Sequence, residues 1–412
     1  MRRSAVIAAS VLDQAASSLT NILVLVMAAR VSTTSGFAAF SMVYLTFTVL
    51  LGLNMSYVGQ AVVLERGDAG TLATACRSAA AFTGCAALGA GVLLAAGGAV
   101  TGGRIGDAFL ALGCVLPVVL LQDGLRYSFS ALQQPHRALA ADVLRLMCVV
   151  PALLTQPHHA SPARLVAVWG ASAAPALLVG LLLLRPFVRG AATRLRGYVR
   201  RGHLGMRFVV EFAVGNASSQ LAVLGLGLFA SPLAVGALRG ATTLFGPLNV
   251  LFNSVNAFGP PVLGRLGGRR ATARAAALLG CVLAAVGFGW AAVLYALPAR
   301  MGHQLLGATW RPASALLPAT GSQYAVMALG TCALVTLRVL SPRATLSLQV
   351  VFSLVSVMLM LGGYAMGGAI GAAWGLAAGS ALKAVAGWMR VAALGPAAEP
   401  APEGQRSTAP LS

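Results

Sequence analysis

Two carboxylates and three guanidinium groups lie close together in the sequence, within residues 120–146. The charged residues of this stretch are Asp123, Arg126, Arg137, Asp142 and Arg145. They stand out because only 9% of the 412 residues are charged. Two neighbouring carboxylates can act together as general acid and base, can bind a cationic cargo, or can pair with arginines and hold helices together. The elements that carry these side chains decide among the three roles.

The composition limits the choice of those elements. Hydrophobic residues make up 58% of the chain, and apolar runs recur from one end to the other. So little polar surface cannot cover the core of a soluble globule, which predicts a polytopic membrane protein. The formal net charge of +20 would suggest a nucleic-acid partner for a soluble protein. Here the arginines fall between apolar runs, where membrane topology explains them, and we expect no nucleic-acid partner.

Apolar stretches that could cross a bilayer of about 30 Å recur along the whole chain. We expect them near 6–29, 37–64, 79–100, 109–125, 138–154, 165–184, 208–230, 235–262, 275–298, 313–337, 346–361 and 370–394. The last two are separated only by the sequence GGYAMGG. The sequence therefore predicts an all-α membrane protein with about twelve transmembrane helices.

The distribution of arginine and lysine predicts the orientation. With the N-terminus in the cytoplasm, the inner loops and helix ends hold 21 of the 29 basic residues, and the outer loops hold five. Inner loops of membrane proteins carry such an excess of positive charge. We therefore expect a multi-pass protein of the plasma membrane with both termini in the cytoplasm. The outer loops are too short for the large outer domain that a membrane glycosyltransferase would need.

The longest inner loop, 185–207, divides the chain near its middle. It holds seven arginines and no acidic residue, and we expect it to contact anionic lipid headgroups. The predicted domains are an N-terminal six-helix bundle over 1–184, the basic cytoplasmic linker over 185–207, a C-terminal six-helix bundle over 208–395 and a disordered tail over 396–412.

The two halves show a weak internal repeat. Gly36 corresponds to Gly236 and Asn54 to Asn253, and the offset between matching positions stays within 199–201 residues. Because each half has an even number of spans, the repeats are parallel and related by an axis along the membrane normal. Transporters built in this way bind substrate between the halves, near the middle of the membrane. The repeat therefore predicts an alternating-access transporter.

Several segments resemble a known superfamily. They are the stretch 120–146 and the segments SSLTNILVLVMAARVSTTSGFAAFSMVYLTFTVLLGLNMSYVGQAVVL, GALRGATTLFGPLNVLFNSVNAFGPPVLGRL and LLGATWRPASALLP. They resemble polysaccharide flippase-like members of the multidrug/oligosaccharidyl-lipid/polysaccharide (MOP) exporter superfamily, which includes lipid II flippases and multidrug and toxin extrusion (MATE) transporters. The resemblance implies a V-shaped transporter of two helical bundles with a central cavity. In the lipid-carrier branches the cavity is cationic and receives a polyprenyl-pyrophosphate sugar. In the drug-extruding branch it is commonly acidic and receives organic cations.

Three basic residues within or at the ends of the spans are candidates for binding cargo: Arg239, Arg30 and Lys383. A charged residue inside a membrane span costs about 2.5–3.5 kcal/mol on insertion scales, so it usually faces protein or water. The resemblance places Arg239 on the cavity, and no acidic residue lies within four positions of any of the three. Unpaired cations suit a pyrophosphate and repel cationic drugs. Alternatively, Arg30 and Lys383 reach the membrane interfaces.

Four asparagines lie within the second and eighth spans: Asn54, Asn249, Asn253 and Asn256. Asn249, Asn253 and Asn256 are four and three positions apart and share one face of a helix. This face could bind sugar hydroxyls in the cavity. Equally, amides within a membrane hydrogen-bond neighbouring helices and hold them together.

Two acidic residues occupy matching places near the inner ends of spans one and seven, Asp13 and Glu211. A carboxylate there could carry a coupling proton or sodium ion. The alternative for Asp13 is a helix-capping role with Ser10, and for Glu211 a helix-surface pair with Arg207. Both alternatives stay open.

The stretch 120–146 reads as the inner hairpin between spans four and five, turning near Gln134 and Pro135. Residues equally far from the turn face each other in an antiparallel hairpin. We therefore predict two ion pairs, Asp123 with Arg145 and Arg126 with Asp142, and we expect Arg137 to reach the headgroups. These pairs would clamp the two spans rather than perform catalysis.

The sequence contains no Ser–His–acid arrangement, no phosphate-binding glycine loop and no His or Cys cluster. We therefore expect no enzyme activity, metal or cofactor. The predicted function is to flip a lipid-linked oligosaccharide or polysaccharide precursor from the inner to the outer leaflet. The alternatives are a multidrug-extrusion antiporter, separated by the sign of the cavity charge, and a non-transporting membrane scaffold that recruits partners through 185–207.

Overall fold

The structure is a computed structural model that describes residues 3–65, 67–200, 202–214, 218–229, 231–263, 268–340 and 342–394. The elements in these ranges are all helices. The predicted all-α class is therefore confirmed, and the tail 396–412 lies outside the described residues.

The first half of the chain forms α1 (Arg3–Val31), α2 (Thr34–Asn54), the π-helix η1 (Met55–Gly59), α3 (Gln60–Val63), α4 (Ala69–Thr101), α5 (Gly103–Ala131), α6 (Pro135–Leu154), α7 (Pro162–Ala171) and α8 (Ala174–Val188). The linking segment contains α9 (Arg196–Val199) and α10 (Leu204–Phe212). The second half forms α11 (Ser218–Phe229), α12 (Pro232–Leu244), α13 (Gly246–Leu263), α14 (Arg269–Tyr295), α15 (Ala299–Leu306), the short 3-10 helix η3 (Gly307–Thr309), α16 (Trp310–Ser314), α17 (Leu317–Leu340) and α18 (Pro342–Ala393).

Polar residues in the loops fix where several helices begin. The Thr33 hydroxyl accepts a hydrogen bond from the Gly36 amide at 3.0 Å at the start of α2. Asp68 accepts one from the Thr71 amide at 2.9 Å at the start of α4. Ser231 caps α12 in the same way and is followed by proline, which needs no hydrogen-bond acceptor at the first helical position. These caps satisfy amide groups that the first turn of a helix leaves free.

Glycine allows two pairs of antiparallel helical segments to lie backbone to backbone. A methyl group added to Gly91 of α4 would collide with the backbone of Gly113 in α5. Within α18 the same holds for Gly363 and Gly371, because the helix doubles back at Gly368, whose φ is +57°. Small residues let membrane helices approach closely. The GGYAMGG sequence is therefore the turn between two packed arms of α18.

The predicted count of twelve spans is not clearly reproduced. Among the described residues, seven helices are long and apolar enough to cross a membrane. The expected span 235–262 is divided into α12 and α13, the expected span 208–230 contains residues outside the described ones, and the last two spans form the single bent helix α18. Periodicity and apolar length do not reveal breaks of one or two residues inside an apolar run.

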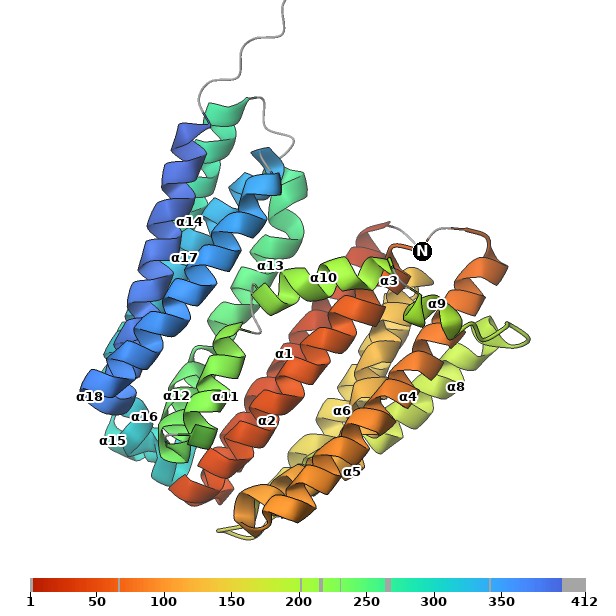
Figure 1. Cartoon of the computed structure of the whole chain (residues 1–412), viewed down its shortest axis with the longest axis horizontal. Helices are drawn as coiled ribbons and strands as arrows, with labels where there is room; N and C mark the ends of the chain where they lie inside the picture. The colour runs from red at the N-terminus through yellow and green to blue at the C-terminus, as the bar shows by residue number, and fades with distance from the viewer. Residues whose placement is uncertain are drawn as a thin grey trace, which may run out of the picture.

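The helices form two groups that diverge towards one end of the molecule (Figure 1). One group contains α1 to α8, and the other contains α13, α14, α17 and α18. Helices α11 and α12 pack against α2 and join the two groups. Helix α10 runs across the diverging end and packs on η1 and α3. We call this end, where α9 and α10 lie, the linker end.

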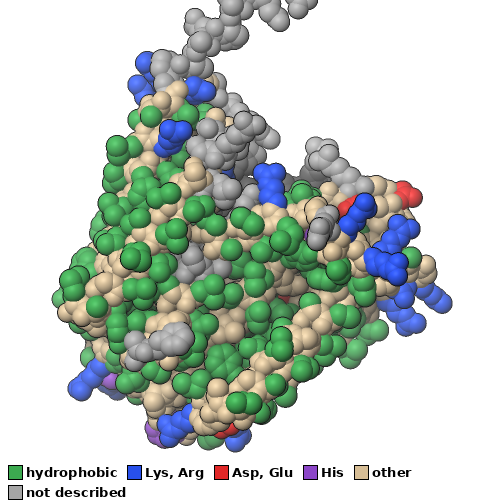
Figure 2. Space-filling model, viewed as in Figure 1, with side chains coloured by type: hydrophobic (Ala, Val, Ile, Leu, Met, Phe, Trp, Pro, Cys, Tyr) green, Lys and Arg blue, Asp and Glu red, His purple; other side chains and the backbone are tan. Residues whose placement is uncertain are grey.

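The flanks of the molecule are apolar and the ends are basic (Figure 2). On α4, Val92 and Leu93 leave 67% and 75% of their surface exposed, and on the first arm of α18 Met358 leaves 70% exposed. Such side chains would be costly in water and are stable against lipid tails. The protein is therefore a multi-pass membrane protein.

Candidate transport site

A cavity of about 850 Å³ lies between the two groups of helices. Residues of α2, α10, α12, α13, α17 and both arms of α18 line it. Its walls extend to the linker end, where Arg207, Phe208 and Phe212 of α10 contribute to the lining. A volume of this size is typical of sites for small molecules or the headgroups of larger ones.

Arg239 and Lys383 both lie on the wall of this cavity: Arg239 where the resemblance placed it, and Lys383 in the first of the two positions considered for it. The guanidinium carbon of Arg239 lies 5.7 Å from the ring centre of Tyr44, across the junction between α12 and α2. The Nε atom of Arg239 is buried without a hydrogen-bond partner. A guanidinium held by a ring face and left with a free donor can bind an anion.

The described lining of the cavity is cationic. It contains four basic residues and no Asp or Glu. In the described parts of the chain the ion pairs all involve Arg126, so neither Arg239 nor Lys383 is paired with a described carboxylate. The other two cations are Arg207 and Arg338, which make further interactions of their own.

The four predicted asparagines do not form one group. Asn249 lines the cavity and donates a hydrogen bond to the Tyr324 hydroxyl at 3.0 Å. Asn54 is outside the described lining and accepts a hydrogen bond from Thr83 of α4 at 2.9 Å. The side chains of Asn253 and Asn256 lie outside the described residues. Arg30 is exposed at the end of α1 opposite the linker end and is also outside the described lining.

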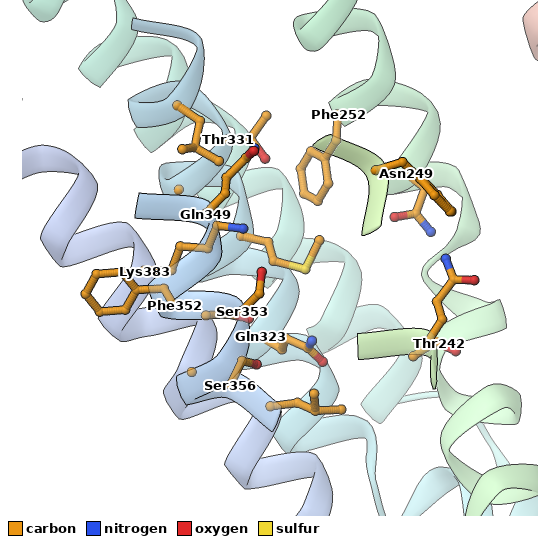
Figure 3. A pocket seen from close by; sticks show the side chains of 18 of the residues that line it. Thr242, Asn249, Phe252, Gln323, Thr331, Gln349, Phe352, Ser353, Ser356 and Lys383 are labelled. Carbon is orange, nitrogen blue, oxygen red and sulfur yellow. The ribbon is translucent and has the colours of Figure 1, made fainter. Parts of the chain in front are cut away.

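The sequence reading missed a row of neutral polar side chains on α17 and α18. They are Gln323, Thr331, Gln349, Ser353, Ser356 and Ser380, which we call the amide–hydroxyl wall. Figure 3 shows Gln349, Ser353 and Ser356 on one side of the cavity, facing Asn249 and Phe252 on the other. The spacing of four and three positions between Gln349, Ser353 and Ser356 was the available signal, because it places them on one helix face.

A second group of charges lies inside the first helical group, around Arg126 of α5. Its guanidinium is 2.8 Å from Asp13 of α1, 3.1 Å from Asp142 of α6 and 3.4 Å from Asp123 of its own helix. Arg126 also donates to the Ser17 hydroxyl at 3.0 Å. One side chain therefore joins three helices.

This arrangement corrects the predicted clamp. The pair of Arg126 with Asp142 is present, but Asp123 contacts Arg126 instead of Arg145. Arg145 donates to the Gln122 side chain at 2.5 Å, and Gln122 donates to Asp142 at 2.9 Å. The prediction paired residues that are equally far from the turn between α5 and α6, so it took only these two helices into account. It could not include Asp13 of α1, which contacts Arg126, or Gln122, which lies between Arg145 and Asp142.

Arg137 also differs from expectation. It donates to the carbonyl oxygen of Leu183 at 2.8 Å and lies 4.6 Å from the centre of the Phe187 ring. Its guanidinium therefore holds the end of α8, where we expected it to reach the headgroups. A cation close to the last carbonyl groups of a helix also offsets the helix dipole.

The two candidate coupling residues are in different situations. Asp13 lies inside α1 and receives two hydrogen bonds from Arg126, of 2.8 and 3.1 Å. It therefore does not cap the helix, contrary to the alternative weighed for it. The backbone of Glu211 belongs to α10, but its side chain lies outside the described residues.

The described chain has an all-helical membrane fold, and solved structures of MOP superfamily transporters have the same fold. The chain matches the lipid II flippase MurJ in an inward closed conformation with a TM-score of 0.69 and 10% identity, over 91% of this chain and 86% of that one. It matches an inward-facing multidrug resistance MATE family transporter with a TM-score of 0.62 and 13% identity, over 92% and 95% of the two chains. The predicted superfamily resemblance is thereby confirmed at the level of the fold.

A third match is to a MOP superfamily transporter from Pyrococcus furiosus whose binding pocket is described as having reverse polarity. Its TM-score is 0.54 and its identity 11%, over 94% of both chains. Neither a family model nor a curated protein sequence matches this chain. The proteins that share this fold are described as a flippase and a multidrug transporter.

Proposed function

We propose that this protein flips a lipid-linked oligosaccharide or polysaccharide precursor from the inner to the outer leaflet by alternating access. The observation that carries the proposal is the sign of the cavity: Arg239 and Lys383 line it and no described Asp or Glu does. Charge-assisted hydrogen bonds from such cations are strongest to phosphate and carboxylate groups. The similarity to the flippase MurJ supports a lipid-linked substrate.

The proposed orientation places the linker end in the cytoplasm. The segment 185–207 with its excess of arginines leads to this end (Figure 1), and inner loops carry such an excess of positive charge. The cavity would then meet the inner leaflet beside α10, where a lipid-linked precursor made in the cytoplasm is available. We keep the proposed division into a bundle over 1–184, a linker over 185–207 that contacts anionic lipid, and a bundle over 208–395.

A multidrug-extrusion antiporter is the alternative on the same fold, and the match to a MATE family transporter is its support. It would have to bind organic cations in a cavity whose described charges are all positive. The third candidate, a membrane scaffold acting through 185–207, requires no cavity chemistry at all. Arg239 would be unfavourable for an antiporter of organic cations, and a scaffold would not need it.

The decisive experiment measures binding and transbilayer movement of a polyprenyl diphosphate bearing a neutral disaccharide in vesicles that contain the purified protein. Arg239→Ala should weaken binding about 10- to 100-fold, the effect of losing a hydrogen bond to a charged group. Arg30→Ala serves as the matched control, because Arg30 is exposed outside the described lining. Unchanged binding in Arg239→Ala, or saturable binding of an organic cation such as tetraphenylphosphonium, would contradict the proposal.

Asp13 and Glu211 are proposed carriers of a coupling proton or sodium ion, with a structural role as the alternative. The contact of Asp13 with Arg126 favours the structural role, because a guanidinium at 2.8 Å competes with a proton or metal ion for the carboxylate. Asp13→Asn distinguishes the two. Loss of gradient-driven transport at an unchanged Tm supports coupling, whereas a lowered Tm with intact gradient dependence supports a structural role.

A further inference from the structure

We propose that Tyr44 is a positioning residue of the transport site: its ring holds the guanidinium of Arg239 at the cavity wall, ready to bind the diphosphate of the cargo. This inference rests on the proposed function and adds to the site a residue that does not touch the cargo. Tyr44 belongs to α2 and is not among the described residues that line the cavity, whereas Arg239 belongs to α12 and lines it. Tyr44 therefore acts on the cargo only through Arg239.

A close contact between α2 and α12 brings the two side chains together. A Cβ atom added to Gly236 of α12 would lie 3.0 Å from the Cα atom of Ala38 in α2, so the two backbones nearly touch. Arg239 follows Gly236 by about one helical turn. Its guanidinium carbon lies 5.7 Å from the ring centre of Tyr44. The packing of the two helices thus places a cation of α12 over an aromatic face of α2.

The ring of Tyr44 is itself held firmly. Only 2% of its surface is exposed, and its hydroxyl donates a hydrogen bond to the side-chain oxygen of Asn21 in α1 at 3.0 Å. Its ring centre lies 5.4 Å from that of Trp169 in α7, 5.7 Å from that of Phe47 and 5.8 Å from that of Phe40. A ring packed on its sides and bonded at its tip offers a fixed surface to the cation.

An aromatic face stabilises a guanidinium without using its hydrogen-bond donors. A carboxylate at the same place would accept hydrogen bonds from the guanidinium and cancel its charge, as the carboxylates around Arg126 do. The ring attracts the cation through its quadrupole and leaves the N–H groups available. The Nε atom of Arg239 is accordingly buried without a hydrogen-bond partner. The ring of Tyr44 therefore lowers the cost of a cation within the membrane and preserves the donors that a phosphate group needs.

Fixing the guanidinium before the cargo arrives raises the affinity for it. A free arginine side chain has many rotamers, and immobilising it on binding costs affinity. In this protein the contact with Tyr44 restricts the side chain of Arg239 in the empty cavity. We expect the contact to change binding of the diphosphate about three- to tenfold, between the effects of exposed and desolvated cation–π contacts.

The test measures binding of two probes to the purified protein: a polyprenyl diphosphate bearing a neutral disaccharide, which we call the neutral glycolipid, and the same lipid without sugar. Tyr44→Leu and Tyr44→Met both remove the aromatic face and should weaken binding of both probes by the same factor, about three- to tenfold. Tyr44→Phe keeps the face and should stay within about twofold of the wild type. In the Arg239→Ala background, Tyr44→Leu should cause no further loss, because nothing is left for it to position.

Phe47→Leu is the matched control, because Phe47 is a buried ring of the same helix that packs on Tyr44 and Trp169 and is outside the described lining. It should lower the Tm and leave binding of both probes unchanged. Wild-type binding by Tyr44→Leu and Tyr44→Met, equal losses in Tyr44→Phe or Phe47→Leu, or a further loss in the Arg239→Ala background would overturn the inference while the flippase function stands. If Arg239→Ala binds the sugar-free lipid as well as the wild type does, the proposed function itself fails.

Discussion

The two groups of charged residues in this protein are built in opposite ways. Around Arg126, three carboxylates from α1, α5 and α6 surround one guanidinium at distances between 2.8 and 3.4 Å. In the cavity, Arg239 and Lys383 have no described carboxylate near enough to pair. The first group holds helices together because its opposite charges form ion pairs. In the second group no described carboxylate pairs with the cations, and an unpaired charge within a membrane protein indicates a ligand.

The difference shows that burial and charge alone do not identify a transport site. Both groups lie within apolar helices, and the cluster around Arg126 has the higher density of charge along the sequence. The two groups differ in whether the described protein supplies residues of opposite charge that pair with them. Removing a residue from the group around Arg126 should therefore affect mainly stability, and removing one from the group in the cavity should affect mainly binding.

The largest effect is expected for Arg126→Ala. This change leaves Asp13, Asp123 and Asp142 without the guanidinium they share, and breaking a buried ion pair on one side costs about 3–5 kcal/mol. We expect a strongly lowered Tm and poor recovery of folded protein in detergent. Arg137→Ala is the control, because Arg137 contacts a carbonyl oxygen and a ring but none of the described carboxylates. Similar Tm values for the two variants would remove the distinction between the groups.

Arg239→Leu should have the opposite profile. Its binding of the neutral glycolipid should fall at least about tenfold, while its free energy of unfolding should be unchanged or higher, since a desolvated cation without an acidic partner is lost. Thermal unfolding in detergent, measured beside the binding experiment, checks both parts. A large drop in Tm would mean that Arg239 holds the two groups of helices together through Tyr44.

Asn54→Ala should have a smaller and purely structural effect. The hydrogen bond between Asn54 and Thr83 joins α2 to α4 away from the cavity, and its loss should cost about 1 kcal/mol. We expect a slightly lowered Tm with unchanged glycolipid binding. A binding defect at an unchanged Tm would place Asn54 in the transport site after all.

The smallest effect is expected for Asp123→Asn. The group around Arg126 contains three carboxylates but only two guanidinium groups, those of Arg126 and Arg145, and Asp123 has the longest contact of the three, at 3.4 Å. An amide of the same shape removes the excess negative charge, so the free energy of unfolding should change by less than about 1 kcal/mol. Asp142→Asn, measured in parallel, should cost more, because Asp142 is bonded by Gln122 and paired with Arg126.

Some parts of the fold and site were accessible from the sequence. Apolar length predicted the membrane class, the two arms around GGYAMGG and the approximate position of each long helix. The cost of a lipid-facing cation made Arg239 and Lys383 candidates for the cavity, although for Lys383 a place at the membrane interface stayed open. The pairing of Arg126 with Asp142 followed from the hairpin turn between α5 and α6.

Other parts could not be predicted. Asp13 is more than a hundred positions from Arg126, and no local pattern links them. The break between α12 and α13 is too short to change the apolar pattern. The amide–hydroxyl wall was missed because its residues are neutral and scattered over α17 and the two arms of α18.

By itself, the sequence determined that the chain lies in a membrane, where it turns, and which charges have no acidic residue near them along the chain. These properties depend on neighbours within one or two helical turns and on the energy of moving side chains into lipid. Only the tertiary structure decided which charges form ion pairs within the protein and which can bind a ligand. A partner for a charge can come from any helix: the packing of α1 against α6 brings Asp13 to Arg126, whereas no described carboxylate pairs with Arg239.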